Sequence, residues 1–174
     1  YNTKVTSFAS TFQSTKINLP SGLFDTNSEV TTFNRCFANC SLVGQSVPVD
    51  FFRYNTKVIS FESLFQYSSL SGNLPEDLFY YNSNVTIYAS TFVNSSNLVL
   101  PTRLFNTANL GKVTTWENLM NVDQTSYSPT GTIQKIWDVS EGGDVVYTVP
   151  PTKTNAFNNC TALTNYSSIP TAWI

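Results

Sequence analysis

The fold of this chain is constrained most by a short phrase that recurs along it at intervals of 25 to 28 residues. In each copy a valine is followed three positions later by an aromatic residue and seven positions later by another large apolar residue. Self-similarity at such a period is the sequence signature of stacked repeat units. The copies begin at Val5, Val30, Val58, Val85 and, in an altered form with Trp116 and Met120, at Val113.

A second phrase keeps the same period and contains an aliphatic residue, a proline, two variable residues, a large apolar residue and a phenylalanine. Two unrelated phrases that stay in phase indicate a structural repeat rather than a chance match. The four copies are LPSGLF (Leu19 to Phe24), VPVDFF (Val47 to Phe52), LPEDLF (Leu74 to Phe79) and LPTRLF (Leu100 to Phe105). The fifth repeat offers only TIQKIW (Thr132 to Trp137), and the chain closes on IPTAW (Ile169 to Trp173).

The spacing within each phrase predicts its local structure. Apolar residues at i, i+3 and i+7 share one face of an α-helix, so VTSFASTF (residues 5–12) and its equivalents are expected to form short helices. The residue before proline favours extended geometry, and proline suits the start of a turn, so the second phrase predicts an extended segment and a tight turn. Such elements are marginal alone, and stacking would bury two rings per unit in a continuous aromatic ladder. The sequence therefore predicts an α/β solenoid of 25–28-residue units.

Three segments follow from this pattern. Residues 1–120 hold four regular repeats and the start of a fifth. Residues 121–155 interrupt the fifth repeat, and two β-prone stretches around Glu141-Gly142-Gly143-Asp144 predict a hairpin whose glycines supply positive φ. This segment is expected either to cap the stack or to form a binding loop, and capping is favoured because terminal repeats depart from consensus. Residues 156–174 are expected to be a partial C-terminal repeat or cap.

The first residues lie in the middle of a repeat. The letters YNTKV occur at residues 1–5 and again at residues 54–58, where they link one unit to the next valine phrase. We therefore expect that Tyr1 is not a natural start, that the chain is part of a longer chain or assembly, and that the face of its first repeat stacks on a further unit.

The valine phrase resembles the repeats of the BspA-like leucine-rich repeat family and related bacterial surface repeats, whose pattern is VTNMxxMFxxC. The likeness is closest at Val30 to Leu42 and at Phe157 to Leu163, where CFANCSLV and AFNNCTAL match the family's MFxxCxxL. This chain departs from the family in carrying phenylalanine for methionine and in the added Leu-Pro phrase. The resemblance implies a leucine-rich-repeat-like stack and a surface-exposed adhesion or recognition module of bacteria, and similar arrays occur in tail or fibre proteins of phages and prophages.

Composition excludes several classes of function. Charged residues make up 11% of the chain and the formal net charge is -2, so there is no basic surface for nucleic acid. No apolar run approaches the roughly 20 residues that span a bilayer, so we expect no direct membrane insertion. A phosphate-binding loop is also missing, since the chain has only seven glycines. We expect no cofactor.

Catalytic and metal-binding constellations are weak. The chain has no histidine, which removes the usual general base and a common zinc ligand. Cys40 and Cys160 match the family's buried small position, where other repeats carry Thr15, Ser68 and Ser95, so we interpret the cysteines, Cys36 included, as structural. The acidic pair Glu76-Asp77 occupies two variable positions and is expected to be solvated. The sequence therefore predicts a protein that is not an enzyme.

Binding residues are sought among exposed aromatic and variable positions. Ring stacking on sugars or peptides is typical of such surfaces, although the same tyrosines could simply cover neighbouring turns. The candidates are Tyr54, Tyr67, Tyr80 and Tyr81, which lie outside the repeating core positions, and Asn18, Ser46, Asn73 and Val99, which precede the pre-proline residue.

We therefore expect a non-catalytic recognition or adhesion module that binds a protein or glycan on a host or neighbouring cell. The expected location is extracellular or on the bacterial cell surface, or in a phage virion. The alternative is a structural spacer or receptor-binding part of a phage or prophage tail or of a surface assembly.

Overall fold

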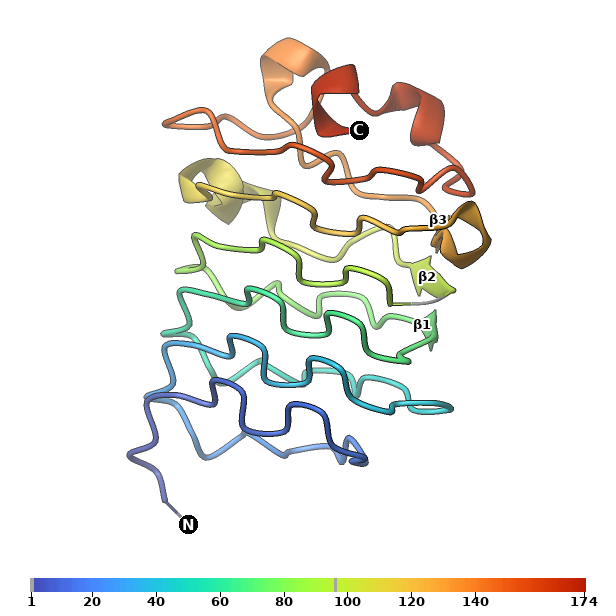
Figure 1. Cartoon of the computed structure of the whole chain (residues 1–174). Helices are drawn as coiled ribbons and strands as arrows, with labels where there is room; N and C mark the ends of the chain where they lie inside the picture. Colours follow the sequence, from blue (N-terminus) through green and yellow to red (C-terminus); the bar gives the residue numbers. More distant parts are fainter. Residues whose placement is uncertain (1, 96) are drawn as a thin grey trace.

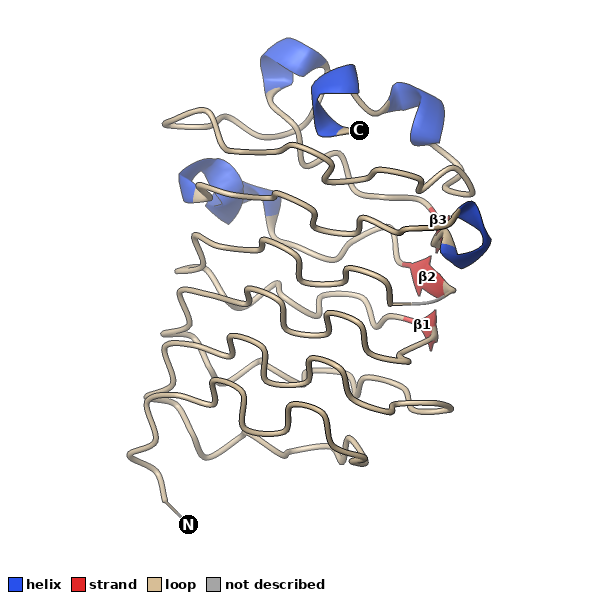
Figure 2. Ribbon diagram, in the orientation of Figure 1, coloured by secondary structure: helices blue, strands red, loops and turns tan. Residues whose placement is uncertain are grey.

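The chain is wound into layers that lie one above another, with its N-terminal and C-terminal segments at opposite ends of the stack (Figure 1). The computed structural model describes residues 2–95 and 97–174. Three short parallel strands pair in the order β1-β2-β3, and the remaining described chain consists of turns, loops and short 3₁₀ helices (Figure 2). The elements are β1 (Gly72–Asn73), β2 (Leu98–Leu100), η1 (Thr107–Lys112), η2 (Thr125–Tyr127), β3 (Thr130–Gly131), η3 (Val139–Glu141), η4 (Tyr166–Ser168) and η5 (Thr171–Trp173).

The predicted α/β solenoid of strand–helix units is wrong. No α-helix occurs in the described residues, and only three short segments are strands. In the first valine phrase Ser10 and Ser14 have φ angles of 53° and 58°, whereas residues of an α-helix have φ near −60°. The equivalent residues of the later phrases are also left-handed, and they are Arg35, Asn39, Ser63, Tyr67, Ser90, Asn94 and Asn118. The predicted helices therefore do not form.

Each valine phrase is instead a series of tight turns with a period of four residues. In the first phrase the N–H of Thr11 donates to the carbonyl of Phe8 and closes one turn. The N–H groups of Phe8, Ser10, Phe12 and Ser14 do not bond within the phrase but donate to carbonyls of the next layer, at 2.9 to 3.0 Å. A four-residue period also places Phe8 and Phe12 on one side, which is why their spacing resembles that of a helix.

The same bonding pattern defines six layers. Layers 1 to 5 contain the valine phrases that begin at Val5, Val30, Val58, Val85 and Val113. Layer 6 runs through residues 152–159, because the N–H groups of Trp116 and Met120 donate to the carbonyls of Thr152 and Ala156. One column of single-residue parallel bridges crosses all six layers, through Ser7, Thr32, Ser60, Ile87, Thr115 and Thr152.

Aromatic rings fill the core between these layers, as the predicted ladder requires. In one column Phe33 stacks on Phe61 at 5.8 Å and almost parallel, and in a second column Phe37 stacks on Phe65 at 5.4 Å. A third column comes from the proline phrases, where Phe52 stacks on Phe79 at 6.0 Å. Each fully buried ring contributes about 1.5–3 kcal/mol through removal of apolar area from water. The leucine-rich-repeat character is nevertheless wrong, because residues 2–95 and 97–174 contain no repeating strand–helix units.

A ladder of buried asparagines runs beside the rings. Asn55 is 1% exposed, and its Nδ2 donates to the carbonyls of Phe24 and Asn27 at 3.1 and 3.0 Å. Asn82 makes the equivalent pair of bonds one layer later. The ladder ends there because layer 5 carries the buried Leu110 at this position.

The predicted hairpin around Glu141 to Asp144 is also wrong. Asp138 and Val145 form a parallel bridge, and the residues between them make η3 and a loop rather than two antiparallel strands. Gly142 does have the expected positive φ, at 80°. Gly143 is needed for another reason, since a Cβ there would lie 1.9 Å from the carbonyl oxygen of Trp137.

The last layer closes the aromatic core with tryptophans. Lys153 occupies the position that aromatic rings hold in layers 1 to 5, so the first column would stop at Trp116. Trp173 of η5 lies over this end, with its ring 6.4 Å from Trp116, 6.5 Å from Trp137 and 6.2 Å from Phe157. The C-terminal residues therefore cover the core at this end.

Candidate binding surface

Three of the four candidate tyrosines come together on one exposed surface with two arginines. We call this group the tyrosine–arginine patch: Arg53, Tyr54, Tyr80, Tyr81 and Arg103. The rings of Tyr80 and Tyr81 meet edge to face at 5.4 Å. The guanidinium of Arg53 lies 4.9 Å from the ring centre of Tyr81 and 5.9 Å from that of Tyr54, and that of Arg103 lies 5.5 Å from Tyr80.

Turns in the proline phrases place these side chains outside the core. Asp50 and Asp77 have a φ of 61°, and the equivalent Gly22 has a φ of 74°, so the chain bends sharply two residues after the proline in the first three phrases. Glycine and aspartate tolerate this left-handed conformation better than most residues. The two following residues turn into the ring core, and the next pair, such as Arg53 and Tyr54, emerges at the surface.

Ion pairs hold the two arginines in place. Arg103 donates from Nε and Nη2 to the two carboxylate oxygens of Asp77, at 2.5 and 2.6 Å. Arg53 donates from Nη1 to Asp50 at 3.2 Å. These side-chain hydrogen bonds raise the pKa of both guanidinium groups above their usual value. Each arginine is therefore a fixed, permanently charged plane beside a tyrosine ring.

The patch offers ring faces and edges to solvent. Tyr54 is 52% exposed and Tyr81 is also exposed, while Tyr80 is half-buried. An aromatic face can stack on a sugar ring or a peptide, and the phenolic hydroxyls and the arginine N–H groups can donate hydrogen bonds. The arrangement is therefore suited to binding rather than to proton transfer.

The remaining candidates do not join this patch. Tyr67 is 50% exposed, but its ring makes no aromatic or cation–π contact with any described residue. Asn73 and Val99 are exposed and lie side by side, because they pair in the register of β1 and β2. Asn18 and Ser46 are exposed in layers 1 and 2, and no described hydrogen bond of their side chains links them to the other two.

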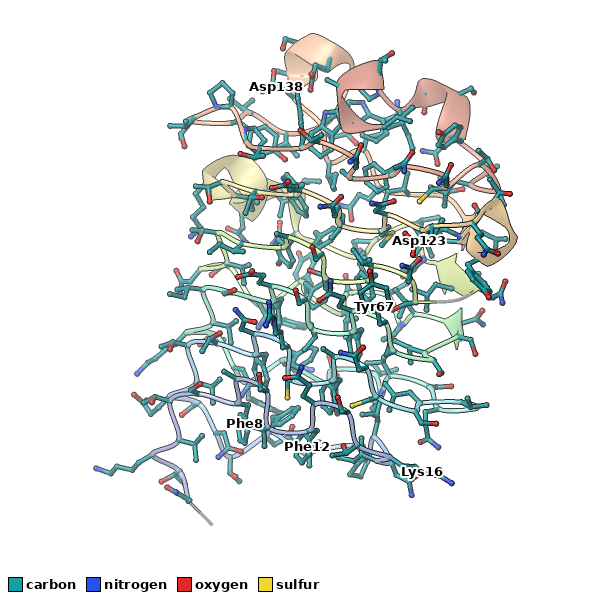
Figure 3. All side chains as sticks on the ribbon, in the orientation of Figure 1. Phe8, Phe12, Lys16, Tyr67, Asp123 and Asp138 are labelled. Carbon is teal, nitrogen blue, oxygen red and sulfur yellow. The ribbon has the colours of Figure 1, made fainter. Side chains whose placement is uncertain are left out.

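A second group of polar side chains lies beside the last layer, near the labelled Asp138 (Figure 3). It surrounds a cavity of about 260 Å³. The lining residues are Asp138, Ser140, Glu141, Tyr147, Pro150, Pro151 and Lys153.

The charged groups of this cavity already have partners. Lys153 donates to Glu141, which also accepts a hydrogen bond from the indole N–H of Trp173 at 3.1 Å. Burial raises the pKa of Glu141, but the bonds from Lys153 and Trp173 and the charge of Lys153 outweigh it and hold the pKa below its usual value. Asp138 accepts from the hydroxyl and N–H of Ser140, and these bonds lower the pKa of its carboxyl. We therefore interpret this hydrogen-bond network as structural: it holds Trp173 over the end of the aromatic core.

The three cysteines are buried free thiols. Cys36, Cys40 and Cys160 are all unpaired and at most 2% exposed. Burial raises the pKa of Cys160 to about 12 and also raises that of Cys36, so neither is a thiolate at neutral pH.

In the described residues no group of three or more His, Cys, Asp or Glu side chains is arranged to hold a metal ion. None of the described helices has the length and apolar character needed to cross a membrane.

Sequence reasoning missed the two arginines of the patch. A signal for them was present, because the same repeat position carries Asp50, Asp77 and Arg103 in successive layers. Opposite charges at one repeat position, like aspartate and arginine here, indicate a pair across adjacent layers. Arg53 is placed differently, because it pairs with Asp50 three residues earlier in the chain and its guanidinium lies beside Tyr81 of the next repeat.

Comparisons with protein-family models, with curated proteins and with solved structures find no match for this chain. The resemblance to the BspA-like family stays a prediction.

Proposed function

We propose that this protein is a non-catalytic recognition module that binds a protein or glycan partner through the tyrosine–arginine patch. The observation that carries this proposal is that three tyrosines and two arginines from three successive repeats come together on one exposed surface. Residues of these two types dominate the energetics of many binding surfaces.

The chemistry of the patch favours a partner with flat apolar faces and polar edges. Its two guanidinium groups are matched by the carboxylates of Asp50 and Asp77, so it has little net charge to attract a strongly charged polymer. Only 11% of the residues of the chain are charged, so strong electrostatic attraction elsewhere on the surface is not expected either. Sugar rings and peptide segments with aromatic or aliphatic side chains fit such a surface.

A catalytic role is less suited to these residues. Several carboxylates already have structural partners. For example, Glu76 accepts a hydrogen bond from Thr102, Asp77 pairs with Arg103, and Glu141 pairs with Lys153. With no histidine in the chain, the proposed activity is binding alone. In keeping with the sequence resemblance, we place the protein at the bacterial cell surface, in the extracellular space or in a phage virion, as part of a longer chain or assembly.

The test is a binding screen against glycan and protein arrays, with the wild-type chain and a variant that carries both Tyr54→Ala and Tyr81→Ala. We expect the double substitution to weaken binding of any hit by at least about tenfold, because two stacking rings are lost. Tyr67→Ala is the matched control, since it removes an equally exposed tyrosine outside the patch. A hit that both variants bind as tightly as the wild type does would refute the role of the patch.

The alternative function is that of a structural spacer or receptor-binding part of a tail or surface assembly. In that case the double variant should assemble as the wild type does, and the screen should return no hit that depends on the patch.

A further inference from the structure

The two aspartate–arginine pairs of the tyrosine–arginine patch differ in how much of their hydrogen bonding is used. In the pair of Asp77 and Arg103, the guanidinium donates to both carboxylate oxygens. In the pair of Asp50 and Arg53, only Nη1 donates, and only to Oδ2. Within residues 2–95 and 97–174, Oδ1 of Asp50 accepts no hydrogen bond, and Nε and Nη2 of Arg53 donate none. We call the first the closed pair and the second the open pair.

The open pair is held by the backbone and faces solvent. Asp50 and Arg53 belong to one turn, in which the N–H of Arg53 donates to the carbonyl of Asp50 at 2.9 Å. The side chain of Asp50 is 43% exposed and that of Arg53 is 44% exposed, so a ligand can reach both polar groups. An acceptor and donors that are already fixed side by side lose little conformational freedom when a ligand binds.

Two tyrosine rings flank the open pair. Tyr54 and Tyr81 hold one repeat position in adjacent layers, and the guanidinium of Arg53 lies 5.9 and 4.9 Å from their ring centres. The ring of Tyr54 is the more exposed of the two, and in the described part of the chain neither phenolic hydroxyl forms a hydrogen bond. An apolar ring face therefore lies beside an acceptor and donors whose charges offset each other.

This combination matches the two kinds of surface on a neutral pyranose sugar. When the hydroxyls of the sugar are equatorial, they lie at the rim of the ring and leave C–H groups on its faces. Such a face can pack on a tyrosine ring. Of two neighbouring hydroxyls at the rim, one can donate to Oδ1 of Asp50 while the other accepts from an N–H of Arg53.

Other ligands use only part of the site. A phosphate or carboxylate accepts hydrogen bonds but donates none, so it would leave Oδ1 of Asp50 without a partner. An apolar peptide side chain could cover the ring of Tyr54, but it would pair with neither Asp50 nor Arg53. The observations therefore favour a sugar over an anion or an apolar peptide.

We propose that the open pair and the rings of Tyr54 and Tyr81 bind a neutral sugar that carries neighbouring equatorial hydroxyls. This inference rests on the proposed function and makes it more specific, because it names a glycan as the partner. The closed pair gives an internal contrast, since both oxygens of Asp77 are already bonded to Arg103.

The probe is cellotetraose, whose glucose units carry neighbouring equatorial hydroxyls. It is titrated into the full chain, and binding is followed through backbone amide shifts. We expect saturable shifts at residues 50–54 and 80–81, with the other layers unchanged. Hexaethylene glycol is the control ligand, because it is neutral but has neither a ring nor neighbouring hydroxyls, and it should cause no saturable shifts.

The matched variants are Asp50→Asn and Asp77→Asn. Both residues have a φ of 61°, which asparagine tolerates, and both substitutions remove one negative charge. Asp50→Asn should weaken cellotetraose binding by at least about tenfold, because the charged acceptor is lost and Arg53 is no longer held by an ion pair. Asp77→Asn should bind the sugar as the wild type does. The amide spectra of both variants show whether they are folded.

Three results would overturn the sugar site: no binding of cellotetraose, unchanged binding by a folded Asp50→Asn variant, or equal weakening by both variants. The array screen then separates this inference from the proposed function. Hits that still depend on Tyr54 and Tyr81 would leave the proposed function in place with a different partner. If no hit depends on these rings either, both proposals fail.

Discussion

The left-handed residues of the valine phrases can be tested by comparing glycine and alanine variants. The sign of their difference in stability distinguishes the observed turns from helices. Arg35 has a φ of 55°, and its side chain is exposed and forms no hydrogen bond or ion pair with the described residues. Replacing it by alanine or by glycine therefore changes the backbone preference at one site and little else. We compare Arg35→Gly with Arg35→Ala.

The two conformations give opposite rankings. An L-residue pays roughly 1–2 kcal/mol for a left-handed conformation that glycine adopts freely. Glycine loses roughly 0.4–1 kcal/mol through the greater freedom of its unfolded chain. At Arg35 we therefore expect the glycine variant to be more stable than the alanine variant by about 0.5–1 kcal/mol, whereas in a helix alanine would be favoured by about 1 kcal/mol.

The measurement is urea unfolding followed by the fluorescence of Trp116, Trp137 and Trp173, which are buried in the folded state. Thr31 provides the control site, because it is exposed and is not among the residues with a positive φ. There the alanine variant should be the more stable of the pair, and the hydroxyl is lost from both. An alanine variant at Arg35 that is more stable than the glycine variant would refute the turn structure.

Three further substitutions test the polar ladder and the closed end. Asn55→Leu should lower the free energy of unfolding by about 1–3 kcal/mol, because two buried hydrogen bonds are lost, and an unchanged urea midpoint would contradict this. Trp173→Ala should cost about 3–5 kcal/mol, measured as a fall in Tm, since it opens the core over layer 6. The pKa of Glu141 is lower in the folded state than its ordinary 4.5, so its pair with Lys153 stabilises the protein above that pH, and this contribution is lost as the pH falls through the folded pKa. Glu141→Gln should remove that pH dependence, whereas a curve still parallel to the wild type in acid would exclude the pair as its source.

The layered arrangement and the core could be predicted from the sequence, but the backbone path within a layer could not. Phe33, Phe61 and their equivalents recur at one period, and burial of these rings follows from that period alone. The spacing of Phe8 and Phe12 fits a helix and a four-residue turn equally well, so periodicity does not separate them. The missing signal was chemical, because the residue two positions after each ring is often serine or asparagine, and asparagine favours a left-handed conformation.

The candidate surface was predictable only in part. Tyr54, Tyr80 and Tyr81 were identified because they fall outside the core positions, and the structure places them together. Their contacts with Arg53 and Arg103 join side chains of successive repeats, and the sequence indicated only the pair of Asp77 and Arg103, through their shared repeat position. The sequence therefore identified single exposed tyrosines, and the stacking geometry was needed to see that they share one surface.

The bonds between layers share a direction, and this has an electrostatic consequence. Four N–H groups of each valine phrase point toward the next layer, while fewer N–H groups point the opposite way, as from Thr31 to Thr6 and from Ser41 to Thr15. Aligned peptide dipoles add along an axis, so the stack has a partial negative charge at layer 1 and a partial positive charge at layer 6. The exposed Lys4 and Lys16 lie in layer 1, where a positive charge is favourable, whereas the carboxylate of Glu141 at the other end is already paired with Lys153. The backbone is therefore electrically polar along the stack, independently of the net side-chain charge of -2.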